Sequence, residues 1–449
     1  MIKLIKSIVF IVIIMLASCT NNDDNPPKII PEIKSINEFI SVEPQIQNTD
    51  FVFPSSHTFQ KIIETGDPLT TGGTLPIRND FTGYVPINGS SINGYLSINS
   101  ETTPGGVSIL DFNLNTTTQL WEITSSQAVD FSAVGSTINN CSGTVTPWNT
   151  IISCEERTQA IDENNDGYND FGWAVEINPS TKKVINKRWA LGNFAHENVT
   201  IHSNLRTVYQ GADSNPGYLY KFVADKETDL SSGDLFVYKG SKEGPGNWVQ
   251  INNTTILERN TTLDQSAAVG AAVFNGIEDV EIGPDGMVYF AVKGVGIVYR
   301  FQDADPISGT DVVMEPFVGG NIDYTITHKE GETNIAWGLG NDNLAFDGEG
   351  NLWVLQDGGL NENNMWVVEK GHTQSNPKVK LFGVAPIGSE PTGITFTPDF
   401  KYLFMSIQSP DANNSSSEQF DAAGNSIKFD NHITLVMALH ENLGNLGNL

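Results

Sequence analysis

The sequence has little positive charge and few cysteines, and it shows no long amphipathic helix. Lysine and arginine number 25 against 53 aspartates and glutamates, so the formal net charge is -28. A chain without a basic face does not bind nucleic acid through its charge. Strong acidity is expected of a protein that holds several hard cations, although plain solubility would also explain it.

The apolar run Ile8–Leu16 is too short to span a membrane. It follows two lysines and ends at Ala17-Ser18-Cys19, which is typical of a secretory signal and resembles a bacterial lipobox. We therefore expect residues 1–19 to be a lipoprotein signal peptide with Cys19 lipidated. The protein would then be exported to the cell envelope, in the periplasm or at the cell surface, and touch membrane only through this anchor. Residues 20–40 predict a flexible tether.

A pattern of a polar residue, a short alternating strand, a turn and a second apolar run recurs along the chain. It occurs in Glu278–Phe290, Asp342–Val354 and Thr392–Phe404, and a degenerate copy begins at Glu197. Alternation broken by Pro-Asp-Gly or Gly-Glu-Gly is typical of hairpins, and hairpins about fifty residues apart indicate propeller blades.

The predicted fold class is therefore all-β, with a six-bladed β-propeller over residues 41–440 that carries inserted loops. Only Thr255–Val273 has alanines at helical spacing. Residues 441–449 form a low-complexity tail, which we expect to lie outside the core.

Four polar residues occupy one register of this repeat. Glu197, Glu278, Asp342 and Thr392 each lie two places before the first apolar residue of a strand. The inner strands of a propeller line a central channel, so one register forms a ring at its mouth. Polar residues often simply begin strands, but three carboxylates in one register favour a shared metal site. His196, beside Glu197, is a further candidate.

Two cysteines remain after lipidation, Cys141 and Cys154. In an exported protein such a pair is usually a disulfide. Cys154, however, is followed by Glu155 and Glu156 at a predicted strand end, which places a soft ligand beside hard ones. That mixture suits iron better than calcium alone.

An acidic loop follows this strand. Oxygen donors at positions 1, 3, 5 and 9 with glycine at position 6 match the start of an EF-hand-type calcium loop, but position 12 is Trp173. We expect a structural calcium loop between strands, with a solvated acidic turn as the alternative. Its ligands would be Asp162, Asn164, Asp166, Tyr168 and Asp170.

Several motifs together resemble the PhoX-type family of secreted bacterial alkaline phosphatases. Thr146-Pro147-Trp148 leading to Cys154-Glu155-Glu156 is similar to the family's Thr-Pro-Trp-Gly and Cys-Glu-Glu run, and Gly192–Glu197 to its Gly-x-Phe-x-His-Glu. Asp342–Asp347 is similar to its Asp-Asn-Leu strand, and Glu390-x-Thr392-Gly393 to its Glu-x-Thr-Gly.

This resemblance implies a phosphomonoesterase that uses Fe3+ and Ca2+ at the channel mouth to act on a small phosphate ester. The catalytic metal ligands would be Cys154, Glu197 and Glu278. Glu155, Asp342 and Glu390 would complete the cluster. We expect a monomer.

Two departures concern the groups that read phosphate. Phosphatase members typically have Arg-Pro-Glu where this chain has Gly276-Ile277-Glu278, and Gln-His-Pro where it has Gln408-Ser409-Pro410. An arginine suited to bidentate phosphate binding is therefore missing. Arg259, Arg300 and Lys293 are near in sequence, but the sequence places none of them at the channel.

Two other functions remain open. A calcium-dependent, lactonase-like propeller hydrolase would hold one ion with Glu, Asn and Asp and would need no cysteine. A non-catalytic binding propeller would use calcium for stability alone, so Glu278→Ala would cost stability but no turnover.

Overall fold

The computed structural model describes residues 35–358 and 363–444. The predicted signal peptide with Cys19 lies outside the described residues. Within those ranges the α-helices are α1 (Ile256–Asn260) and α2 (Thr262–Ala268), both in the stretch predicted to be helical. None of the helices in the described ranges has the length and apolar character needed to cross a membrane.

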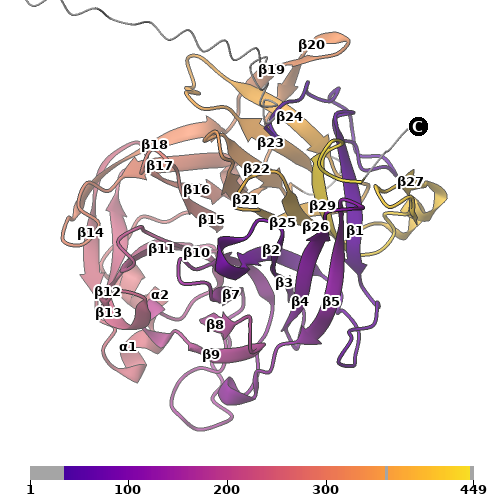
Figure 1. Cartoon of the computed structure of the whole chain (residues 1–449). Helices are drawn as coiled ribbons and strands as arrows, with labels where there is room; N and C mark the ends of the chain where they lie inside the picture. The colour runs from indigo at the N-terminus through magenta and orange to yellow at the C-terminus, as the bar shows by residue number, and fades with distance from the viewer. Residues whose placement is uncertain (1–34, 359–362, 445–449) are drawn as a thin grey trace, which may run out of the picture. The chain divides into compact units, whose positions relative to one another are not determined.

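The strands form four separate four-stranded sheets and one nine-stranded sheet. The nine-stranded sheet contains two blades, β10–β14 and β15–β18, joined where β14 pairs with β18. Each blade is antiparallel, and Figure 1 shows the sheets around a common centre. The strands, blade by blade, are β2 (Asn79–Pro86), β3 (Asn93–Ser100), β4 (Gly106–Asn115) and β5 (Leu120–Ala128); β6 (Asn140–Val145), β7 (Ile151–Glu155), β8 (Ala174–Asn178) and β9 (Lys183–Lys187); β10 (His196–Ile201), β11 (Thr207–Ala212), β12 (Leu219–Lys226), β13 (Asp229–Gly240) and β14 (Gly244–Ile251); β15 (Ile277–Ile282), β16 (Val288–Val292), β17 (Ile297–Gln302) and β18 (Asp311–Gly319); β21 (Asn341–Phe346), β22 (Leu352–Gln356), β23 (Asn364–Val368) and β24 (Val379–Val384); and β25 (Glu390–Phe396), β26 (Leu403–Gln408), β29 (Ile433–Leu439) and β1 (His57–Glu64).

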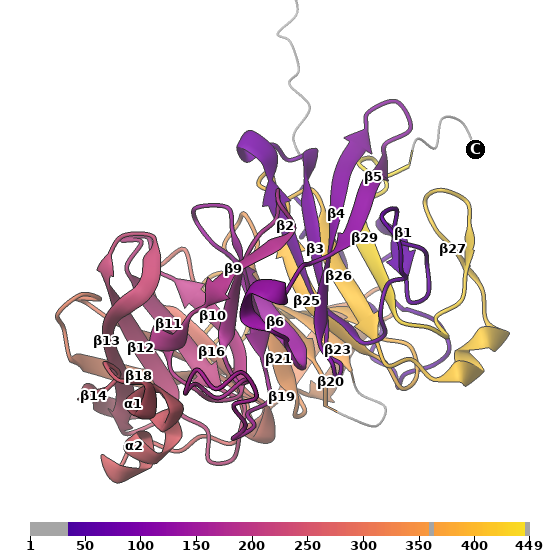
Figure 2. The ribbon, with the colours of Figure 1, turned by 90° about the horizontal axis from the view of Figure 1, so that it is seen from below.

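The first strands of the blades contact one another in a closed ring, β2–β6–β10–β15–β21–β25 and back to β2. The last blade is completed by the N-terminal strand β1, which pairs with the C-terminal strand β29 (Figure 2). Joining the two ends of the chain in one sheet closes the circle without a free edge between first and last blade. The predicted propeller is confirmed, with its blades arranged as six around the ring.

Two smaller hairpins lie beside the blades, β19 (Asp323–His328) with β20 (Gly331–Ala336) and β27 (Gln419–Phe420) with β28 (Ser426–Ile427). The predicted turn after Ile282 is also present: Gly286 adopts φ +78° and donates its N–H to the carbonyl of Gly283. Glycine adopts this left-handed conformation at little cost, which explains the Pro-Asp-Gly signal.

Both predicted ends of the propeller domain differ from the structure. Ile36 and Phe39, assigned to the tether, lie in an apolar cluster with Phe59 and Trp353. Leu443, assigned to the tail, is buried against the first and last blades. These apolar side chains are widely spaced in otherwise polar segments, so composition alone concealed them.

Candidate metal centre

Every inner strand contains a β-bulge near its start, where two consecutive residues face one residue of the second strand. A bulge redirects the side chains of the strand that carries it. Because the inner strands form a ring, the bulges place six equivalent positions around the channel mouth. The first residues of the bulges are Asp80, Cys141, Glu197, Glu278, Asp342 and Gly393.

Five of these residues, all except Gly393, line a cavity of about 330 Å³. Eight carboxylates and the Cys141 thiol line it, together with the cations Arg78 and Lys293. Ligand atoms approach within 4.8 Å of one another in four groups, and successive groups share Cys141, Glu197 or Asp342. The groups are Asp80–Glu101–Cys141, Cys141–Glu156–Glu197, Glu197–Glu278–Asp342 and Asp342–Asp357–Glu390.

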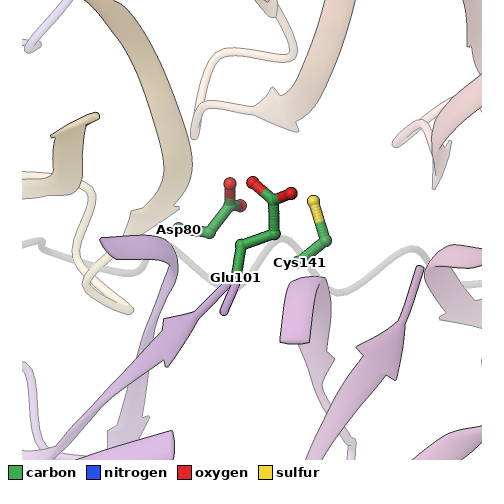
Figure 3. Close-up of side chains that lie close together, drawn as sticks. All are labelled: Asp80, Glu101 and Cys141. Carbon is green, nitrogen blue, oxygen red and sulfur yellow. The ribbon is translucent and has the colours of Figure 1, made fainter. Parts of the chain in front are cut away.

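Figure 3 shows the first group, in which Asp80, Glu101 and Cys141 point the same way from neighbouring strands. Asp80 is held on both oxygens: Gln408 Nε2 donates to Oδ2 at 2.8 Å, and Thr392 Oγ1 donates to Oδ1 at 3.0 Å. Glu101 accepts hydrogen bonds from Asn139 Nδ2 at 3.2 Å and from Arg78 Nη1 at 3.4 Å. The group is thus oriented before any ligand binds.

The carboxylates at the centre of the arc are not satisfied by the protein alone. Glu197 and Glu278 are each only 1% exposed, and Glu197 Oε2 and Glu278 Oε1 make no hydrogen bond. Burial and the carboxylates of Glu278 and Asp342 raise the pKa of Glu197 well above its usual range. Burial raises the pKa of Asp342 to about 6, although Lys293 opposes the shift. Buried charges are costly unless paired, so the cluster is suited to binding cations.

Four of the predicted metal ligands lie together in this cavity: Glu197, Glu278, Asp342 and Glu390. Glu390 lies in one group with Asp342 and Asp357, with ligand atoms within 4.8 Å of one another. His196 is not among the lining residues; its ring stacks on Phe194 with centroids 3.7 Å apart, and its Nε2 donates to the Gly192 carbonyl.

Cys154, the cysteine predicted to bind metal, lies outside the cavity and outside all four metal-capable groups. It lies on β7 opposite the bulge formed by Cys141 and Ser142, so its side chain faces an apolar cluster with Phe194 and Val199. Cys141 occupies the bulge position instead, and its Sγ lies 3.6 Å from Glu197 Oε1. Both thiols are free, and burial raises the pKa of each.

Glu155 is also outside the metal-capable groups, because the protein itself satisfies its carboxylate. Lys187 Nζ and Thr137 Oγ1 each donate to Oε1 at 2.8 Å. The backbone N–H groups of Gly172 and Trp173 donate to Oε2 at 2.9 and 3.1 Å. Its neighbour Glu156, directly after the end of β7, lines the cavity instead.

Thr392 is one place out of the predicted register. It pairs with Ser406 in the ladder, and the bulge begins at Gly393, where φ is +68°. Thr392 Oγ1 instead connects two blades by hydrogen-bonding to Asp80 and to Asn343 Oδ1.

The predicted calcium loop is closed by its own backbone. Asp162 Oδ1 accepts the N–H of Asp166 at 3.0 Å, and Oδ2 accepts the N–H of Gly167 at 2.9 Å. Tyr168 stacks on Trp189, and its hydroxyl accepts a hydrogen bond from Arg259. A calcium ion here stays a prediction.

The comparisons with known proteins agree with the propeller fold. The family model for alkaline phosphatase PhoX matches residues 115–411. The structure of Pseudomonas fluorescens PhoX in complex with vanadate, a transition state analogue, aligns with a TM-score of 0.72 at 20% identity, covering 91% of this chain and 99% of that chain.

A putative 6-phosphogluconolactonase from Bacteroides uniformis aligns with a TM-score of only 0.42 at 12% identity, covering 87% of this chain and 100% of that one. That similarity is too low to carry an argument. No curated protein sequence matches the chain. The PhoX family model covers more than half of the sequence, so the chain belongs to the alkaline phosphatase PhoX family of phosphoric monoester hydrolases.

Proposed function

We propose that this protein is an exported phosphomonoesterase that holds Fe3+ and Ca2+ in the ring of bulge residues and acts on small phosphate esters. Membership of the PhoX family supports the reaction. The observation that carries the proposal is the continuous arc of four metal-capable groups around one cavity. Export, a lipid anchor at Cys19 and a monomeric state are part of the same proposal, and the first two rest on the signal-like pattern of residues 1–19.

The donor set fits the two kinds of ion. Cys141 would supply sulfur, which iron favours and which binds as the thiolate once metal displaces its proton, and it belongs to two adjacent groups that also contain carboxylates. Glu278 and Asp342 supply the oxygens that calcium requires. When bound, such ions neutralise the negative charge of the phosphoryl group and so allow an acidic chain to accept an anion.

The chain's own residues orient the substrate region. Gln408 and Thr392 fix the Asp80 carboxylate. The Thr392 hydroxyl is also hydrogen-bonded to Asn343 Oδ1, on the inner strand of the neighbouring blade. Asn343 Oδ1 also accepts the N–H of Gly393 at 2.8 Å. These contacts tie three inner strands together below the cavity, which keeps the ligand groups in place.

The direct test is the iron and calcium content of the mature protein purified without chelators, followed by assay on aryl phosphate esters and on lactones. Iron with calcium and phosphate release would support the proposal. Calcium without iron together with lactone hydrolysis would favour the lactonase-like alternative. Bound calcium with no turnover on any ester would favour a binding propeller.

The two cysteines provide a matched pair of variants. We expect Cys141→Ser to weaken iron binding by about 10–100-fold or more, because even groups that only support a metal ligand have effects of that size. Cys154→Ala should leave iron content unchanged, since Cys154 faces the apolar cluster. Metal content of both variants, measured by elemental analysis, checks the assignment. If Cys154→Ala lost its iron and Cys141→Ser kept it, Cys154 would be the iron ligand, as the sequence predicted.

A further inference from the structure

The residues that follow the second strands form a second set, of which Glu101, Glu156, Lys293 and Asp357 line the cavity. In five blades the residue directly after the second strand is charged, and four of these five are carboxylates. In the fourth blade the equivalent position is a lysine. The five residues are Glu101 after β3, Glu156 after β7, Asp213 after β11, Lys293 after β16 and Asp357 after β22.

Lys293 places its ammonium group among carboxylates of two adjacent metal-capable groups. Its Nζ lies 2.7 Å from Asp357 Oδ2, 3.2 Å from Asp342 Oδ2 and 3.7 Å from Glu278 Oε1. Burial lowers the pKa of Lys293, but the nearby carboxylates outweigh it and the net pKa is raised, so the group stays charged. The backbone holds the position: Lys293 N donates to the Gly276 carbonyl, and Gly340 N donates to the Lys293 carbonyl, both at 3.1 Å.

Glycine at position 276 is required by its backbone conformation and by the nearby Asp213 carboxylate. A side chain there would begin 2.7 Å from Asp213 Oδ1 and 3.7 Å from Lys293 Cβ. The φ of Gly276 is +73°, which L-residues rarely adopt. The turn before β15 therefore needs glycine at this position.

We propose that Lys293 is an internal cation that takes the place of one metal ion in the Asp342–Asp357–Glu390 group. The inference rests on the proposed metal centre and adds that this chain fills one of its four groups with a side chain. An ammonium at hydrogen-bonding distance from Asp342 and Asp357 uses the same oxygens that an ion there would need. Two positive charges about 4 Å apart also repel each other.

The test is metal content after equilibration with calcium and removal of free ions. Lys293→Met should hold about one more calcium ion per chain than the wild type, because the freed carboxylates then need a cation. Lys293→Arg keeps the charge and should hold the wild-type content. Lys380→Met removes an ion pair with Glu369 outside the cavity and should also change nothing.

Asp357→Asn keeps the inference testable if Lys293→Met does not fold. It should leave metal content unchanged, because the partner of Asp357 is the lysine; loss of an ion would overturn the inference. Equal metal content in Lys293→Met and the wild type would also overturn it. If the KM of Lys293→Met for the phosphate ester were then raised, Lys293 would instead be a substrate-binding residue. Absence of metal from both proteins would overturn the metal centre itself, a result distinct from either of these.

Discussion

Replacing Glu197 by glutamine is expected to abolish phosphate ester hydrolysis while leaving the propeller folded. Glu197 is shared by two of the four groups, so losing its charge removes a ligand from two ion positions at once. Loss of groups that merely support a metal ligand typically costs about 10–100-fold, so we expect a fall in kcat/KM of more than about 100-fold. The metal content of the variant should fall with its activity.

In the metal-free protein, Glu197→Gln should not lower the free energy of unfolding, although it abolishes activity in the metal-loaded protein. The Glu197 carboxylate is buried and close to Glu278 and Asp342, which raises its pKa, so a neutral side chain of the same shape relieves repulsion. The chelated Glu197→Gln protein should therefore be at least as stable to urea as the chelated wild type. Glu332→Gln, on the exposed hairpin strand β20, is the matched control and should retain full activity. Full turnover in Glu197→Gln would contradict the assignment of the ring.

The repeat predicted both the fold and half of the ring. Three of the four repeats place a carboxylate two residues before an apolar strand residue, and the structure turns each into the first residue of a bulge. Glu390 was found only through the resemblance to the PhoX family. In these blades the local pattern and the tertiary position agree, because the bulge and the strand that follows it are one continuous segment.

The remaining ligands were hidden for physical reasons. Asp80 and Cys141 occupy the same bulge position, but Thr82 and Gly143 stand where the other blades have an apolar residue. Glu101 and Asp357 follow the second strands, and a sequence pattern built on first strands does not reach them. Glu156, also after a second strand, was noticed only because it follows Cys154. Cys154 was predicted as a metal ligand because two carboxylates follow it in the sequence. The β-bulge, which sequence proximity does not reveal, instead directs the Cys141 side chain toward the channel.

The buried pair of Lys187 and Glu155 should control stability without touching the metals. Both side chains are fully buried, with Nζ and Oε1 2.8 Å apart, and Lys187 also contacts the Asp170 carbonyl. Lys187→Met leaves the Glu155 charge buried without a partner, which typically costs about 3–5 kcal/mol of unfolding free energy. Urea denaturation of the metal-loaded protein measures this loss.

Its control is Lys183→Met on the same strand, β9, where the side chain is 66% exposed and 3.9 Å from Asp130. An exposed pair of this kind is worth about 0–1 kcal/mol, so little change is expected. Replacing both members, Lys187→Met with Glu155→Leu, should recover much of the lost stability, because no unpaired charge then remains. If Glu155 were a metal ligand, the double variant would lose metal as well. Unchanged metal content with restored stability would identify Glu155 as a structural partner of Lys187, whose charge pairing holds β7 against β9 behind the ring.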